Sequence, residues 1–277
     1  MKLRVEHSTV FEYTAPVYET ATEVRLQPAD TSTENNNSGR PYCLDFSLQV
    51  TPKPTHMFRY TDYFGNTVHH FNLLQSHTRL EITADILVET GKLSGSNMDN
   101  PVLLQDFSLE SPYIAVDDSI REFARQYEHF ADPWEKAQAV CSGINQWLVY
   151  EPGVTGVYST TTEVIELGRG VCQDFAHVMI ASCRQLGLPA RYVSGYLYGG
   201  VDTEFFDRAS HAWCEVYGGA EYGWIGLDPT HLNLHVNDNY IKIGTGRDYG
   251  DVTLVRGTFK GTATEKLTAN VRITSVL

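Results

Sequence analysis

The chain has 277 residues, a length that suits two ordinary domains or one very large one. Hydrophobic residues make up 42% of it, which is enough for a sizeable core and excludes a disordered chain. The formal net charge of −13 argues against partners that need clustered positive charge on the protein. Neither nucleic acid nor an anionic membrane surface is therefore expected as a partner.

The sequence also predicts a compartment. Lys2, Arg4 and Glu6 interrupt the N-terminal ten residues, so no secretory signal is expected. There is no run of about 18 apolar residues, so no membrane span is expected. The cysteines are odd in number and lack the dense spacing of a disulfide scaffold, which predicts reduced thiols in a cytoplasmic protein. They are Cys43, Cys141, Cys172, Cys183 and Cys214.

Residues 1–105 are expected to form a β-rich domain. Apolar and polar residues alternate with period two in several segments, most clearly over 80–88. The pair Gly65-Asn66 between two extended runs predicts a hairpin. One apolar face per strand favours an antiparallel, sandwich-like domain, and a turn-rich stretch over 91–112 places the boundary near residue 105.

Residues 106–277 have a different character and are expected to form an α+β domain with an antiparallel sheet. Helical periodicity is seen over 119–127, 133–148, 161–167 and 172–186. Strands are expected over 190–199, 211–218 and 223–230, and the tail over 240–277 is expected to form further short strands.

The stretch GRGVCQDFAH, residues 168–177, places Cys172 at the start of a predicted helix. The helix turns by about 100° per residue, so several apolar residues lie within roughly 40° of Cys172. Cys172 therefore heads a buried stripe. The other members of that stripe are Ala176, Met179, Cys183 and Leu186.

The position of Cys172 favours a reactive thiol. The dipole and the unpaired backbone N–H groups of a helix N-terminus favour the thiolate, and the same groups can hold an oxyanion. Asp174 and His177 lie about 160° and 140° away around the helix, so both are interpreted as structural. The alternative for Cys172 is a small buried residue. That interpretation is adopted for Cys43, Cys141 and Cys183.

A nucleophilic cysteine needs a base, and the base needs an orienting partner. SHAWCEVY places His211 on one face of a predicted strand, and GWIGLDP places Asp228 on the corresponding face of the next. GGAEYG predicts a turn between them, so the strands are expected to pair as a hairpin with His211 beside Asp228. An aspartate there fixes the imidazole tautomer and stabilises the imidazolium. The alternatives are an ordinary sheet histidine and a turn-forming Asp-Pro pair.

Together, GVCQDFAH, GLPARYVSGYL, SHAWCEVY and GWIGLDPTH resemble the core motifs of bacterial transglutaminase-like proteins, which are also described as cysteine proteases. Residues 246–261 are similar to the C-terminal signature of that family, and the β-rich region resembles its N-terminal domain. The resemblance implies a papain-like core in which a central helix packs on an antiparallel sheet. By motif position it implies Cys172 as nucleophile, His211 as general base and acid, and Asp228 as orienting residue.

A metal site is the rival interpretation of this region. The chain has no C-x₂-C pair, and the H-x₃-H spacing of His231 and His235 falls in a predicted loop, so structural zinc is not expected. No pair of carboxylates marks a glycosidase. Neither a metal nor another cofactor is expected. The residues that would have to be recruited to the metal are Cys172, Cys183, Cys214, His211, His231 and His235.

The predicted activity is acyl transfer through a thioester on Cys172. Water would resolve the thioester in a protease or amidase, and an amine would resolve it in a transglutaminase. Hydrolysis is the default because water is abundant. A peptide, a protein or a small amide would serve as substrate, and Trp147, Tyr150 and Gln173 are candidates for a second oxyanion donor. The alternative is an interaction module with an unused triad.

Overall fold

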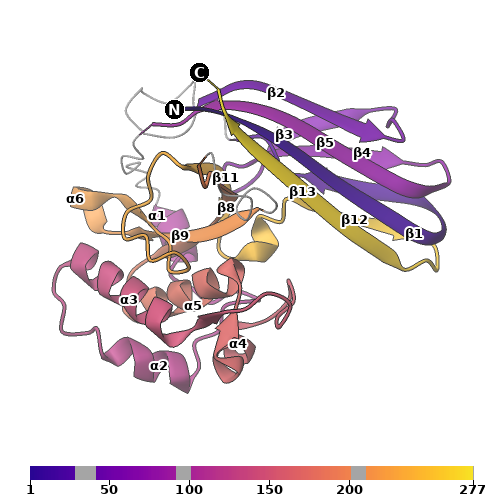
Figure 1. Ribbon diagram of the computed structural model, residues 1–277. Coiled ribbons are helices and arrows are strands. Elements are labelled where there is room, and N and C mark those ends of the chain that lie inside the picture. Colours follow the sequence, from indigo (N-terminus) through magenta and orange to yellow (C-terminus); the bar gives the residue numbers. More distant parts are fainter. Residues whose placement is uncertain (29–41, 92–100, 201–209, 277) are drawn as a thin grey trace.

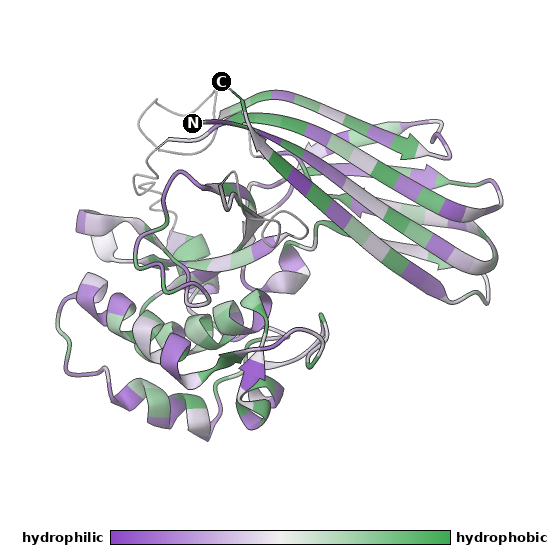
Figure 2. Cartoon of the chain, viewed as in Figure 1, coloured by the Kyte–Doolittle hydropathy of each residue, from purple (hydrophilic) through white to green (hydrophobic). Residues whose placement is uncertain are grey.

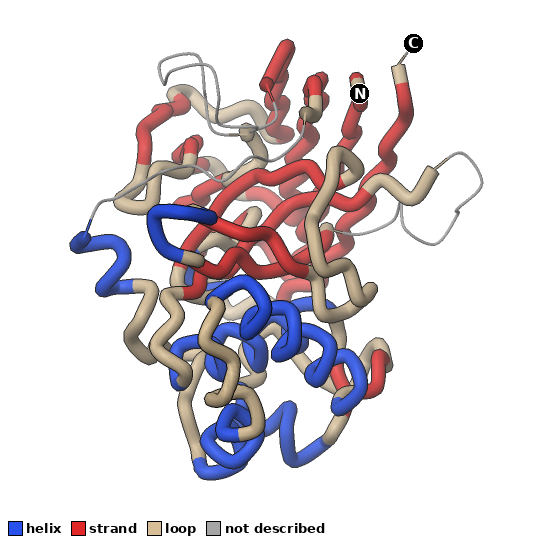
Figure 3. The backbone as a smooth tube through the Cα atoms, turned by 90° about the vertical axis from the view of Figure 1, so that its left-hand side faces the viewer, coloured by secondary structure: helices blue, strands red, loops and turns tan. Residues whose placement is uncertain are grey.

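The computed structural model describes residues 1–28, 42–91, 101–200 and 210–276. A long, curled antiparallel sheet forms one end, and a group of helices around a smaller sheet forms the other (Figure 1). This arrangement confirms the predicted mixture of helices and antiparallel strands. Seen from the side, the smaller sheet lies between the helices and the large sheet (Figure 3).

The large sheet has seven strands, and β1 lies at its centre. The predicted hairpin at Gly65 joins β3 to β4, and Gly65 has the positive φ of 84° that such a turn requires. Hydrophobic and hydrophilic residues alternate along these strands (Figure 2). The strands are β1 (Lys2–Val24), β2 (Tyr42–Thr51), β3 (Met57–Thr61), β4 (Thr67–Leu73), β5 (His77–Glu89), β12 (Val255–Lys260) and β13 (Glu265–Ser275).

The strand β1 belongs to two layers. Its first half pairs with β5 and β13, and its second half pairs with β4 and β12. The pairing with β5 is irregular between Glu12 and Val17, where the strand passes from one layer to the other. Because the apolar faces of both halves share one core, the region is sandwich-like as predicted.

The strands β12 and β13 come from the end of the chain but pair with β1. A division at residue 105 would assign them to the second domain, whereas the pairing joins them to the first sheet. The sequence predicts the strands but not their partner, because alternation gives a strand its faces and leaves its neighbour open. The boundary at 105 itself stays a prediction, since residues 92–100 lie outside the described ranges.

The second part contains a four-stranded sheet in the order β10-β9-β8-β11, with helices packed against it. All four predicted helices form within two residues of their expected bounds. The helices are α2 (Asp118–Arg125), α3 (Pro133–Trp147), α4 (Thr161–Leu167) and α5 (Cys172–Gln185), and the strands are β8 (Ala190–Leu197), β9 (His211–Tyr217), β10 (Trp224–Leu227) and β11 (Tyr240–Gly246).

Shorter elements connect these. The sequence did not predict α1 (Pro101–Asp106) or α6 (Gly219–Tyr222), which occupies the turn between β9 and β10. Both are too short for apolar periodicity to show them. The remaining elements are the two-residue strands β6 (Val149–Tyr150) and β7 (Arg169–Gly170) and a 3₁₀ turn, η1 (Tyr249–Asp251).

The helix α5 is the central element of the second part. It contacts β8, β9 and three other helices, and its residues from Gln173 to Arg184 are all buried. The predicted stripe is therefore only part of its buried surface. On the opposite side, the Arg184 guanidinium donates to the carbonyl oxygens of Phe107, Leu109, Ala190 and Arg247, which allows a charged side chain to be buried there.

The two sheets share a hydrophobic core. Tyr196 on β8 and Ile241 and Ile243 on β11 are buried among the apolar residues of the large sheet. The Tyr196 hydroxyl is also 2.8 Å from Nδ1 of His7 on β1. The large sheet is therefore packed directly against the sheet that carries His211.

Candidate functional site

Cys172 begins α5, at the position that the sequence predicts. The preceding helix, α4, ends at Gly168, whose φ of 67° is left-handed, and the chain then turns into α5. Gly170 lies against the Asp174 side chain, and a Cβ at this glycine would be 2.4 Å from Asp174 Oδ2. The glycines of GRGVC therefore permit the close turn that places Cys172, half-buried, at the free N–H groups of the helix.

Asp174 and His177 have structural contacts, as the helical geometry predicts. Asp174 Oδ2 accepts hydrogen bonds from the backbone N–H of Val171 at 2.7 Å and from the Thr155 hydroxyl at 2.6 Å. His177 Nε2 accepts from the backbone N–H of Tyr249 at 3.2 Å, and burial lowers the pKa of His177 to about 3. The first residue fixes the start of α5, and the second remains a neutral acceptor.

His211 and Asp228 lie together, as the hairpin predicts. Leu227 pairs with Cys214, which brings Asp228 to the beginning of β9. His211 Nε2 is 2.8 Å from Asp228 Oδ2, and both side chains are buried. Because Nε2 is held by Asp228, Nδ1 is the nitrogen that remains for Cys172.

The carboxylate of Asp228 has two further side-chain partners that the sequence did not reveal. His231 Nδ1 lies 2.9 Å from Asp228 Oδ2, and the Tyr240 hydroxyl donates to the same oxygen at 2.8 Å. Oδ1 accepts from the backbone N–H of Thr230 at 2.9 Å. His231 lies two residues after the Asp228-Pro229 turn, and this spacing could have indicated its contact with Asp228. No pattern in the sequence indicates the contact of Tyr240.

Electrostatics favour a charged pair at His211 and Asp228. Burial alone would raise the pKa of Asp228, but hydrogen bonds with His211 and His231 hold it well below its usual range. Burial also disfavours the charged form of His211 and so lowers its pKa. The interactions of His211 with Asp228 and Cys172 outweigh burial and raise the pKa to about 10. His211 therefore holds a proton at neutral pH beside both the carboxylate and the sulfur.

Cys172 and His211 open into one cavity of about 230 Å³. The large sheet provides one wall of it, through His7 and Thr9 on β1 and Leu267 and Ala269 on β13. The lining from the second part comes from the α5 start, β8, β9 and the segment after β11. It comprises Val171, Cys172, Gln173, Tyr192, Ser194, Ser210, His211, Ala212, Tyr249 and Leu254, while Val255, which begins β12, adds to the wall from the large sheet.

The three candidates for a second oxyanion donor lie in different surroundings. The side-chain amide of Gln173 lines the cavity but donates to the Val157 carbonyl at 2.9 Å. Trp147 stacks on Phe123 among the helices, at 4.6 Å between ring centroids. Tyr150 is 54% exposed. Its pKa is raised mainly by partial burial and also by the charge of Cys172, which indicates that Tyr150 lies near the sulfur.

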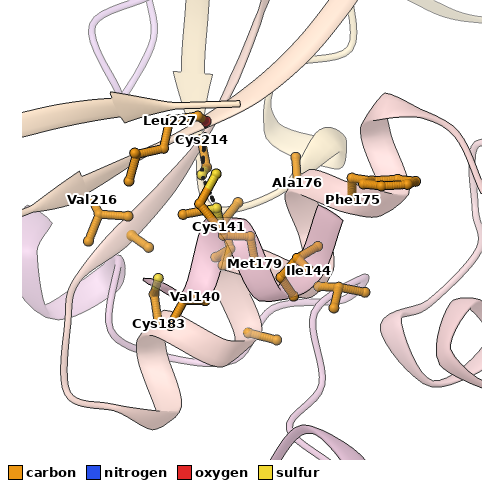
Figure 4. Packing of buried hydrophobic residues seen from close by; sticks show 14 of the residues in the cluster. Val140, Cys141, Ile144, Phe175, Ala176, Met179, Cys183, Cys214, Val216 and Leu227 are labelled. Carbon is orange, nitrogen blue, oxygen red and sulfur yellow. Dashed lines mark hydrogen bonds between the residues drawn. The ribbon is translucent and has the colours of Figure 1, made fainter. Parts of the chain in front are cut away.

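Cys141, Cys183 and Cys214 lie in the core behind the site (Figure 4). The Cys214 thiol donates to the Leu227 carbonyl at 3.3 Å and lies 3.2 Å from the Met179 sulfur. Burial raises the pKa of Cys183 to about 12, so its thiol stays protonated. The expectation that Cys141 and Cys183 are core residues agrees with this packing. Cys43, which was also expected to be a small buried residue, lies on β2 and is only half-buried.

Among the residues that the structure describes, the metal-ligand atoms of His211, Asp228 and His231 lie within 4.8 Å of one another. The hydrogen bonds of both imidazoles to Asp228 account for this proximity. Two of the three cysteines that a zinc site would recruit, Cys183 and Cys214, lie in the core instead. Within the same described ranges, no helix has the length and apolar character to cross a membrane.

Two sequence families match the chain. Residues 121–229 match the transglutaminase-like superfamily, and residues 3–89 match the bacterial transglutaminase-like N-terminal region. The first range contains Cys172, His211 and Asp228. The second covers the first five strands of the large sheet.

Individual relatives agree with these matches. A protein of Mycobacterium leprae without assigned activity is 32% identical over 286 residues, which cover 99% of this chain and 98% of the relative. A protein-glutamine gamma-glutamyltransferase of Pseudomonas aeruginosa is 33% identical over 88 residues, 29% of this chain and 13% of that protein. The fold resembles a proposed cysteine protease from Cytophaga hutchinsonii, with a TM-score of 0.78, 24% identity and coverage of 100% and 91% of the two chains.

Proposed function

The chain belongs to the transglutaminase-like superfamily, and from that premise we propose that it is a cysteine-dependent enzyme that breaks an amide bond through a thioester on Cys172. The observation that carries the proposal is the arrangement of His211. Its Nε2 is bonded to Asp228 at 2.8 Å, and its ring opens into the same cavity as Cys172.

In the first half of the proposed reaction, the Cys172 sulfur attacks the carbonyl carbon of the amide. The backbone N–H of Cys172 at the helix N-terminus helps to hold the oxyanion. His211 gives its proton to the leaving nitrogen as the C–N bond breaks, which leaves a thioester and a neutral imidazole. Asp228 holds the imidazole in the orientation that this transfer needs.

In the second half, neutral His211 takes a proton from water while the oxygen attacks the thioester. The C–S bond breaks, a carboxylic acid leaves, and the imidazolium again faces the Cys172 sulfur. We favour water over an amine as the acceptor, which makes the enzyme a peptidase or amidase. The Pseudomonas aeruginosa relative is a transferase, so an amine acceptor is the other outcome to measure.

The proposed setting is a reducing compartment such as the cytoplasm. Among the described residues, Cys141, Cys172, Cys183 and Cys214 form no disulfide. A thiol nucleophile needs such conditions to stay active.

Mass spectrometry after iodoacetamide treatment tests the nucleophile. We expect Cys172 to be labelled before the other cysteines, because its side chain opens into the cavity beside His211. Cys172→Ala should keep its thermal unfolding temperature and lose all turnover of a peptide and amide library. The matched control is Cys43→Ala, which removes a half-buried cysteine on β2, outside the site.

The outcomes separate the proposal from its alternative. Turnover that survives in Cys172→Ala rejects the nucleophile. Slow and uniform labelling of all thiols, without turnover of any amide, would favour an interaction module with an unused triad. Addition of a primary amine during turnover distinguishes the acceptors, because a transglutaminase forms the new amide and a hydrolase forms the acid.

A further inference from the structure

One carboxylate oxygen of Asp228 is shared by three side chains. His211 Nε2, His231 Nδ1 and the Tyr240 hydroxyl lie 2.8, 2.9 and 2.8 Å from Oδ2. The carboxylate is ionised, so all three groups donate to it. An oxygen offers two lone pairs, and three donors therefore compete for the same electron density.

We propose that His231 is a positioning residue, which shares the Asp228 carboxylate with His211 and thereby weakens the hold of Asp228 on the His211 proton. The inference rests on the proposed function, in which His211 must release that proton to the leaving nitrogen. A histidine bound too tightly by its carboxylate would be a poor acid in that step.

The backbone of the loop that carries His231 is held by groups other than its side chain. Asp228 and Asn233 exchange two backbone hydrogen bonds of 2.9 Å that close the loop. The Asn145 amide on α3 also donates to the carbonyls of Pro229 at 2.8 Å and Thr230 at 3.2 Å. With the backbone of the loop fixed in this way, the imidazole of His231 is held where its N–H donates to the carboxylate of Asp228.

The direction of the effect does not depend on the charge of His231. A neutral His231 withdraws electron density from Asp228 through its N–H, and a cationic His231 also repels the proton on His211. Both lower the proton affinity of His211, so removal of the side chain must raise it. The side chain is 33% exposed, so solvent reaches it while Asp228 remains fully buried.

Other groups around the pair are accounted for. Cys172 on α5 faces His211 and raises its pKa, as Asp228 does. Tyr240 on β11 stays a neutral donor, because burial raises its pKa. His7 on β1 lines the same cavity, and burial lowers its pKa to about 4, so it is neutral near pH 7. His231 is therefore the group whose removal changes the sharing at Asp228 while these neighbours stay in place.

The titration of the His211 imidazole, followed by NMR, tests the inference without a substrate. In His231→Ala we expect its midpoint to rise by about 0.5 to 1 pH unit, the effect of losing one neighbouring hydrogen bond. In His231→Asn the amide nitrogen can occupy the place of Nδ1, and the midpoint should return toward the wild-type value. The matched control is His235→Ala, an exposed histidine of the same loop that contacts Trp134.

Turnover provides the second readout. Once an amide substrate is found, His231→Ala should lower kcat roughly tenfold with KM unchanged. The alkaline limb of the pH profile of kcat should also move to higher pH. A midpoint that stays or falls in His231→Ala, or a failure of His231→Asn to restore it, would overturn the inference. An absence of turnover in the wild type would overturn the proposed function and leave the titration result standing.

Discussion

His211 carries the proton of the proposed reaction, and its pKa sets the pH range. Burial lowers that pKa, but Asp228 and Cys172 raise it to about 10. The imidazolium therefore persists through neutral pH and is lost only as the pH rises through that value. We expect kcat/KM for an amide to fall above about pH 10, because the leaving nitrogen then receives no proton.

The comparison of two histidines tests this assignment. His211→Ala should abolish alkylation of Cys172 at low pH. His177→Gln should preserve it, because the glutamine oxygen can accept from the Tyr249 N–H as His177 Nε2 does. Iodoacetamide rates across pH provide the measurement, and equal loss in both variants would show that the wrong histidine was chosen.

Gly170 offers a second test at the residue scale. A methyl group at Gly170 would lie 2.4 Å from Oδ2 of Asp174. The same oxygen accepts the hydrogen bond from the backbone N–H of Val171. We expect Gly170→Ala to cost about 1–3 kcal/mol of stability and to slow the alkylation of Cys172. Gly156→Ala is the matched control, since nothing lies within 4 Å of a Cβ at that glycine. Urea unfolding of both variants measures the difference, and equal stabilities would contradict the explanation.

The positions of Cys172, His211 and Asp228 were predictable because each residue sits in a strong local pattern. Cys172 follows a glycine turn into a helix, and His211 and Asp228 lie on consecutive strands with a short connection. His231 and Tyr240 were missed because their contacts depend on the path of a loop. Hydrophobic periodicity describes faces of helices and strands, and a loop has no such period.

At the scale of elements, the strand β13 gives the cavity a wall. Leu267 and Ala269 face the cavity, and Thr268 lies between them on the opposite face of the strand. The large sheet therefore limits what can approach Cys172, which suggests that it selects substrates by the shape of the acyl group.

A pair of substitutions on β13 checks this role. Ala269→Phe should reduce the cavity and lower kcat/KM for bulky amides more than for small ones, with little change in the rate of iodoacetamide labelling. Thr268→Phe adds the same ring to the other face and should leave the preference unchanged. Equal effects of the two variants on bulky and small substrates would show that the wall plays no part in selection.

Helices, strands and the partners within hairpins were mostly predictable, and long-range strand partners were not. The alternation of β13 shows that it has an apolar and a polar face, but its partner β1 lies more than 240 residues earlier, since Leu3 pairs with Ser275. Long-range pairing is decided by which surfaces fit together in the folded chain. For the same reason, alternation does not show which strands of the large sheet line the cavity.

For the whole molecule, buried neutral histidines predict sensitivity to acid. Burial lowers the pKa of His7 to about 4 and that of His177 to about 3. In the unfolded chain both take up protons near pH 6.5, so protonation favours unfolding as the pH falls from about 6.5 toward 4. Each residue contributes a slope of up to about 1.4 kcal/mol per pH unit.

Urea midpoints measured across that range test the expectation. The wild type should lose stability steadily as the pH falls, and His7→Gln should lose it less steeply, because one of the two titrations is absent. His7 bonds to Tyr196, so the variant also reports on the junction of the two sheets. A stability that is flat from neutral pH to about pH 4 would contradict the role given to these histidines.

The pairing of β1 with β13 has a consequence for synthesis on the ribosome. The ribosome makes β1 before β13, so one edge of β1 stays unpaired until the residues of β13 emerge. Cys172, His211 and Asp228 are made before that point, while Leu267 and Ala269 of the cavity wall are not. A nascent chain therefore contains the proposed nucleophile, base and orienting residue before its cavity is closed, and selectivity for substrates should arise only once β13 has paired with β1.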